Sequence, residues 1–316
     1  PSGRRRCVMT LTILQPSVQT TLQGAPRIGS RHLGVPTSGP ADPLSMALAN
    51  RLVGNASDAT AIEITFGGAA IRFDTPVSFA ITGAQSALTL AGRVIEPHAT
   101  HTAGEGDELH IAPARQGCRV YVAIAANIEA NVFLGSTSTY LPAALGGHES
   151  RALKAGDAIN LAAIRITPSM QTPEDLHPVC SNSYALRAVE GPDFPAPARH
   201  MWDETFTVTQ RASRMGVELE GAFPHLPEDA THPSAAIFPG ALQLPPGGRG
   251  FLLLADAQTT GGYPHLLQVI RADRHLLGQI RPGDRIRFLH RTQQQATDDL
   301  RAKQALLSAW LPDFHL

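Results

Sequence analysis

Apolar and polar residues alternate along most of the chain in short segments, which is the pattern of β-strands buried on one face. Glycine, proline or aspartate bounds these segments, as expected for strands joined by turns. The pattern predicts strands at residues 10–14, 61–66, 69–73, 88–90, 119–125 and 285–289. The sequence therefore predicts a mainly β protein.

Two segments have helical patterns instead. Residues 42–53 begin with Asp42, which can cap a helix, and with a proline suited to the first turn, while Gly54 can end the helix. The second segment, about residues 293–309, repeats apolar residues at helical spacing. We expect few other helices.

Part of the chain is repeated. Residues 66–79 and 238–251 both contain Phe-x-Gly-Ala and a second phenylalanine eleven residues after the glycine, at an offset of 172 residues. Two further pairs keep the same order at offsets of 167 and 177: residues 52–54 with 219–221, and 106–111 with 283–288. A duplication explains this order, although a β-rich chain also produces chance matches between glycine turns.

The repeat and a proline-rich stretch predict the domain boundaries. Residues 167–183 contain three prolines and little periodicity, which is typical of a linker. We predict a first module at residues 9–166, which carries an extra segment around Gly156-Asp157, and a second module with a C-terminal helix at 184–316. Residues 1–8 are set aside, because Met9 resembles a natural start.

Composition narrows the class of protein. The 316 residues include 26 basic and 27 acidic side chains, a net charge of −1 that argues against a polycation coating nucleic acid. No apolar run reaches the ~18 residues of a membrane-spanning helix. The Arg4–Arg6 run is not followed by an apolar segment and cleavage site, so we expect a cytoplasmic protein. Three distant cysteines indicate neither a disulfide framework nor a zinc site.

Several common chemical motifs are absent from the sequence. It has no P-loop, H-E-x-x-H, G-x-S-x-G or Rossmann glycine motif. The two lysines, Lys154 and Lys303, do not lie in an Ala-Met-Lys-Met context, so we expect no covalently attached biotin. The thirteen histidines show no metal-ligand spacing.

The most informative loop is Asp256–Pro264, which follows the apolar run 251–255. Asp256 and Gln258 could bind or deprotonate a polar substrate, and Thr260 offers a hydroxyl. The Gly261-Gly262 pair lets a ligand approach the backbone closely. The alternative is a simple turn capped by Asp256.

Three other loops are also rich in glycine and polar side chains. Arg31 could bind an anion before the first helix, where Asp42 either contacts a ligand or only caps. Ser136 offers a hydroxyl, although a polar turn also explains it. Arg214 could supply a cationic anchor.

These loops resemble one known family. The similar motifs are Gly34-Val-Pro-x-Ser-Gly39, Ala49–Asn55, Leu134-Gly-Ser136, Arg214-Met-Gly216, Gln258-Thr-Thr-Gly-Gly-Tyr-Pro264 and Pro282-Gly-Asp284. They resemble the biotin-dependent carboxyltransferase-like family, which includes the C subunit of 5-oxoprolinase (formerly allophanate hydrolase subunit 2), the antagonist of a sporulation-kinase inhibitor, and part of urea carboxylase.

The resemblance implies two cyclophilin-like β-barrel modules and a hetero-oligomer with a B subunit. With a separate A subunit, such a complex would open 5-oxoproline to glutamate, using ATP bound with the partner protein. The motif positions imply catalytic and substrate-binding residues but no metal ligand. The implied catalytic residues are Asp256, Gln258, Thr260 and Tyr263; the implied substrate-binding residues are Arg31, Asp42, Arg214, Gly261, Gly262 and Ser136.

The chain departs from the family pattern at a few positions. Gly24 and Pro26 stand where the family has Asp and Gly in Gln-Asp-x-Gly-Arg, and Thr137 replaces the Arg of Gly-Ser-Arg-Ser-Thr. Ala126-Asn127 replaces a Gly-Gly pair. Two other functions stay open: carboxyl transfer from biotin on a separate carrier to urea or another amide, and non-catalytic binding of a kinase-inhibitor-like partner.

Overall fold

The computed structural model describes residues 9–225 and 232–316 and divides the chain into two compact units. Unit 1 comprises the chain up to Ala25, Ser45–Arg115 and Arg119–His177. Unit 2 comprises Pro26–Leu44, Gln116–Cys118 and the chain from Pro178 onward. The set-aside residues 1–8 lie outside the described residues.

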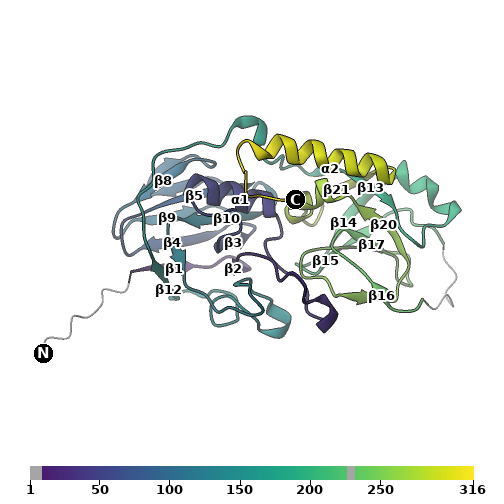
Figure 1. The fold of residues 1–316 in the computed structure, drawn as a ribbon, viewed down its shortest axis with the longest axis horizontal. Helices are drawn as coiled ribbons and strands as arrows, with labels where there is room; N and C mark the ends of the chain where they lie inside the picture. Colours follow the sequence, from purple (N-terminus) through teal and green to yellow (C-terminus); the bar gives the residue numbers. More distant parts are fainter. Residues whose placement is uncertain (1–8, 226–231) are drawn as a thin grey trace, which may run out of the picture. The chain divides into compact units, whose positions relative to one another are not determined.

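Unit 1 is built from two antiparallel sheets (Figure 1). One has seven strands in the order β11-β12-β1-β4-β9-β6-β7, and the other has five in the order β2-β3-β10-β5-β8. Their bounds are β1 Thr10–Gln15, β2 Thr20–Gln23, β3 Ala61–Thr65, β4 Ala69–Phe73, β5 Val77–Gln85, β6 Leu88–Leu90, β7 Arg93–Ile95, β8 Thr100–Ala103, β9 Glu108–Ile111, β10 Gln116–Ile124, β11 Asn127–Ile128 and β12 Ala158–Ala162. Short 3₁₀ turns lie at η2 Leu141–Ala143 and η3 Glu174–Leu176.

Unit 2 contains a closed barrel in the order β13-β20-β17-β18-β15-β14-β21 and a two-stranded sheet, β16-β19 (Figure 1). Side chains alternate between core and solvent along β13, β14 and β21, as the period of two in the sequence predicts. The strands are β13 Ser183–Glu190, β14 Thr205–Ala212, β15 Gly216–Glu220, β16 Ala235–Ala236, β17 Ala241–Gln243, β18 Gly250–Leu253, β19 Thr260–Gly261, β20 His265–Val269 and β21 Arg285–His290. The 3₁₀ segments are η1 Arg31–Leu33, η4 Ala196–Trp202 and η5 Arg271–Gln279.

The described residues form two α-helices, and both predicted helices are confirmed. Helix α1 spans Pro43–Leu52 and ends where Gly54 takes a left-handed φ of 67° and donates to the Arg51 carbonyl. Helix α2 spans Gln293–Ser308 and begins with a capping box between Thr292 and Gln295. Among the described residues, no helix is long and apolar enough to cross a bilayer.

One turn precedes three different strands. Gly106, Gly156 and Gly283 have φ values of 86°, 90° and 90°, which only glycine adopts readily. In each turn the following aspartate accepts a hydrogen bond from the backbone N–H three residues earlier, at 2.7–3.0 Å. Each Gly-Asp pair therefore sets the entry into the next strand: β9, β12 or β21.

The predicted fold class is confirmed in its main feature, since the chain is mainly β with few helices and one closed seven-stranded barrel. All six predicted strands are present with bounds shifted by a few residues at most. The two-module organisation and its boundaries stay predictions. The first half of the predicted linker 167–183 is hydrogen-bonded within unit 1, where Thr167 N–H donates to Ser78 Oγ at 3.0 Å and Thr172 N–H to the His98 carbonyl at 2.9 Å.

Candidate functional site

The loop Asp256–Pro264 follows β18 in unit 2 and runs into β19 and β20. Gly261 packs tightly in it, because a Cβ there would lie 2.6 Å from Gln243 Nε2 and 2.8 Å from Ile237 Cδ1, and these side-chain ends would have to shift. This close approach lets β19 pair with β16 through Gly261 and Ala235. The predicted site loop is therefore held close to the barrel strand β17, which carries Gln243.

Two predicted site residues form a buried ion pair in this region. Arg214 Nε donates to Asp256 Oδ2 at 2.8 Å and Arg214 Nη2 to Asp256 Oδ1 at 3.2 Å, and each side chain is 3% exposed. Arg214 Nη2 also donates to the Gly39 carbonyl at 2.6 Å. A third charge is close: burial lowers the pKa of Arg27, and Asp256 partly offsets this effect. The pair ties the 256–264 loop to the loop before α1.

Arg31 makes a second connection between the loop before α1 and the 256–264 loop. Its Nη2 donates to the carbonyl of Ile237 and, at 3.4 Å, to that of Thr259. The guanidinium lies over the Phe238 ring, 4.7 Å from its centroid. Arg31 thus contacts protein groups on the Asp256–Pro264 side, and burial lowers its pKa.

Asp42 belongs to a different cluster in unit 2. Its Oδ2 accepts from Gln279 Nε2 at 2.7 Å, and Gln279 Oε1 accepts from the Cys118 N–H at 3.0 Å. A Cβ at Gly278 would lie 2.4–2.5 Å from backbone atoms of Ala41 and Asp42, so only glycine permits this packing. Asp42 therefore binds the segment that contains Gly278 and Gln279.

Ser136 lies in unit 1, where its Oγ donates to the Ala25 carbonyl at 2.5 Å. Two departures from the family pattern meet beside it, because a Cβ at Gly24 would lie 2.3 Å from Thr137 Oγ1. Thr137 Oγ1 also lies 2.7 Å from Thr60 Oγ1. In the family pattern, an aspartate at 24 and an arginine at 137 would face each other here. This chain, with Gly24 and Thr137, has neither the acidic nor the basic side chain.

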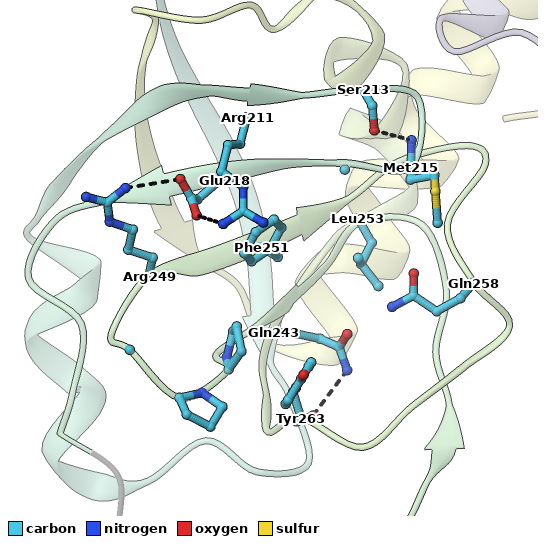
Figure 2. A pocket seen from close by; sticks show the side chains of 14 residues that line it. Arg211, Ser213, Met215, Glu218, Gln243, Arg249, Phe251, Leu253, Gln258 and Tyr263 are labelled. Carbon is cyan, nitrogen blue, oxygen red and sulfur yellow. Dashed lines mark hydrogen bonds and ion pairs between the residues drawn. The ribbon is translucent and has the colours of Figure 1, made fainter. Parts of the chain in front are cut away.

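A pocket of about 670 Å³ opens on the barrel of unit 2 (Figure 2). Two predicted site residues, Gln258 and Tyr263, line it. Thr260 is exposed on β19 and is not among the lining residues, and neither is Asp256. The other lining residues are Arg211, Ser213, Met215, Gly216, Glu218, Gln243, Pro245, Pro246, Gly247, Arg249, Phe251 and Leu253.

One wall of the pocket carries charges that sequence reasoning missed. Glu218 is 2% exposed and accepts from Arg211 Nη1 at 2.9 Å, from Arg249 Nη1 at 3.2 Å and from Thr209 Oγ1 at 2.7 Å. These contacts, led by the Thr209 hydroxyl, lower the pKa of Glu218 against the opposing effect of burial. The sequence feature that could have indicated this site is Glu218 itself, an acidic residue between Val217 and Leu219 in an apolar strand.

The pocket can bind a small polar molecule, since it combines guanidinium groups, carboxamides and apolar side chains in one concave space. The described residues contain no group of three or more His, Cys, Asp or Glu side chains that could hold a metal ion. Binding through hydrogen bonds and charge is the chemistry that this arrangement supports.

Comparisons with known proteins agree with this architecture. Residues 33–290 match the family described as carboxyltransferase domain, subdomain A and B. The chain belongs to this family.

Three individual relatives illustrate the similarity. The chain is 32% identical over 298 residues to the C subunit of 5-oxoprolinase from Escherichia coli, covering 93% of this chain and 94% of the relative. The crystal structure of TTHA0988 superposes with a TM-score of 0.81 at 34% identity, over 91% of this chain and 56% of that one. The Kluyveromyces lactis urea carboxylase superposes with a TM-score of 0.88 at 26% identity, over 96% of this chain and 29% of that one. The chain thus spans only part of both solved relatives.

Proposed function

We propose that this chain is the C subunit of an ATP-dependent 5-oxoprolinase, which acts with a B subunit and a separate A subunit to convert 5-oxoproline to glutamate. The observation that carries this proposal is the end-to-end match with the E. coli protein, since 93% of this chain aligns with 94% of that one. By contrast, the match with the urea carboxylase covers only 29% of that chain.

The proposed enzyme is active only as a complex. The sequence has no P-loop, so we assign ATP to a site formed with the partner protein. We also propose that biotin is not attached to this chain, because neither Lys154 nor Lys303 has the biotin-acceptor context.

Within this proposal, the predicted site residues divide into two roles. Gln258 and Tyr263 line the pocket and can contact a substrate directly. Asp256 and Arg214 bind each other below the surface, so we assign them the positioning of the loop that carries Gln258 and Thr260.

The two-module organisation belongs to the same proposal. We assign cyclophilin-like modules to residues 9–166 and 184–316, joined by 167–183. The equivalent sequence motifs support this assignment: Gly68 and Gly240 both have positive φ directly before β4 and β17. The turns at Gly106-Asp107 and Gly283-Asp284 also share one hydrogen-bond pattern.

Reconstitution tests the proposal. The chain is co-purified with its B subunit and mixed with the A subunit, 5-oxoproline and ATP, and glutamate and ADP are measured. We expect glutamate to form in step with ATP hydrolysis, and to disappear when this chain is omitted. A correctly assembled complex that forms no glutamate would contradict the proposal.

The likeness to urea carboxylase favours a second candidate, carboxyl transfer from biotin on a separate carrier to an amide. This activity would need a biotinylated partner, so avidin should inhibit it. Glutamate formation that is insensitive to avidin would exclude this candidate for the reconstituted complex.

A further inference from the structure

The barrel pocket has two chemically different ends on one face of the sheet. Glu218 lies opposite Phe251 on the neighbouring strand, and Phe251 lies opposite Gln243 on the next. Residues directly opposite each other in antiparallel strands point to the same face. At about 4.8 Å between strands, the backbones at Glu218 and Gln243 lie roughly 10 Å apart. A small molecule can therefore contact both ends.

The Glu218 end carries two arginine side chains. Two guanidinium groups, those of Arg211 and Arg249, share the single buried carboxylate of Glu218. Their side chains are 71% and 51% exposed, against 2% for Glu218. The exposed rim residue Glu220 lies 3.8 Å from Arg249 Nη2.

These guanidiniums are suited to an anionic ligand. Each has five N–H donors, and Glu218 takes one from each. Arg211 is also oriented by Phe251, with its guanidinium 5.2 Å from the ring centroid. A carboxylate can accept from both side chains in a charge-assisted geometry.

The opposite end carries carboxamides (Figure 2). Gln243 is 1% exposed and donates from Nε2 to the Tyr263 carbonyl at 3.1 Å, which fixes its orientation with Oε1 as an acceptor. Gln258 also lines the pocket, and its carboxamide offers both a donor and an acceptor. The apolar side chains of Met215 and Leu253 also line the pocket.

We infer that this pocket binds a small molecule with a carboxylate and an amide a few bonds apart, the carboxylate at Arg211 and Arg249 and the amide at Gln258 and Gln243. The inference rests on the proposed function, since 5-oxoproline carries both groups, and it adds the site and the orientation of that substrate. It makes Arg211 and Arg249 specificity-determining residues.

Binding to the full chain tests this assignment. Calorimetry compares 5-oxoproline with 2-pyrrolidinone, which lacks the carboxylate, and with proline, which lacks the lactam carbonyl. We expect 5-oxoproline to bind at least about tenfold more tightly than either, the difference that one charge-assisted or buried hydrogen bond supplies. Equal affinities for the three compounds, or no binding of any of them, would overturn the inference.

Variants locate the two ends. Arg249→Gln should abolish the preference for 5-oxoproline over 2-pyrrolidinone, whereas Gln258→Leu should weaken both lactams and leave proline unaffected. Arg287→Gln is the matched control, because Arg287 is a 53% exposed arginine on β21 of the same barrel and is not among the pocket-lining residues. An Arg249→Gln chain that keeps the preference would refute the assignment. Thermal unfolding of each variant checks that it is folded.

The reconstituted complex separates this inference from the proposed function. If the complex forms glutamate and Arg249→Gln leaves its KM for 5-oxoproline unchanged, the pocket assignment fails while the function stands. If the chain binds 5-oxoproline through these residues and the complete complex forms no glutamate, the function fails while the pocket assignment stands.

Discussion

The buried pair of Arg214 and Asp256 makes a quantitative prediction for Asp256→Asn. This change keeps the shape of the side chain but removes the negative charge that Arg214 contacts at 2.8 and 3.2 Å. Arg27, which is 0% exposed, loses the attraction of the same carboxylate. Removing one partner of a buried ion pair costs about 3–5 kcal/mol, because the remaining charge stays in a poorly solvated place.

Thermal and urea unfolding measure this cost. About 3–5 kcal/mol corresponds to a fall in Tm of roughly 6–20 °C for a unit of this size. The matched control is Asp203→Asn in the same unit, because Asp203 is 89% exposed and lies 3.9 Å from Arg287. An exposed pair of this kind contributes about 1 kcal/mol or less, so the control should unfold near the wild-type temperature.

A second substitution tests the cause. The loss of unfolding free energy in the double variant Arg214→Met, Asp256→Asn should be smaller than the sum of the losses in the two single variants. The reason is that the double variant no longer buries an Arg214 charge without its carboxylate partner. The reasoning is refuted if Asp256→Asn unfolds within about 1 kcal/mol of wild type. Turnover by the complex is then measured well below the unfolding temperatures of the wild type and the variant. This measurement distinguishes a role of Asp256 in positioning the loop from a direct role in the reaction. A variant that is stable but inactive would favour Asp256 as a chemical participant.

Three further predictions concern stability. Gly278→Ala should cost about 3 kcal/mol in urea unfolding because its Cβ meets rigid backbone, whereas Gly104→Ala, whose nearest atom would be 3.4 Å away, should be close to neutral. Burial and neighbouring His177 lower the pKa of His98 to about 4. Between about pH 6.5 and pH 4 the unfolded chain therefore binds more protons than the folded chain, so the folded protein becomes less stable as the pH falls through this range. His98→Gln should flatten this decline by up to about 3 kcal/mol in unfolding titrations, and identical pH profiles would contradict the assignment. Thr292→Ala should cost about 1 kcal/mol and speed amide exchange in the first turn of α2, and unchanged exchange would argue against the cap.

Local patterns predicted much of the fold. Alternation placed strands such as β4 and β6 at their observed bounds, and proline and glycine bounded α1 closely. These features depend on neighbouring residues, so a single sequence contains them. The barrel closure pairs β13 with β21 in parallel across about 100 residues, and no local pattern encodes that contact.

The site was predicted less completely for the same reason. Gln258 and Tyr263 lie in a distinctive loop and do line the pocket. Glu218 is one acid in an apolar strand, and its arginine partners come from β14 and from the turn before β18. Their association depends on strand register, which alternation does not fix between distant segments.

The contact between Gly24 and Thr137 limits how relatives can guide changes to this chain. An aspartate introduced at 24 would begin with its Cβ 2.3 Å from the Thr137 hydroxyl, at a position that is buried here. An arginine introduced at 137 alone would find no acid at position 24. The two positions should therefore be epistatic: each single reversion toward the family pattern is harmful, and the pair restored together is tolerated.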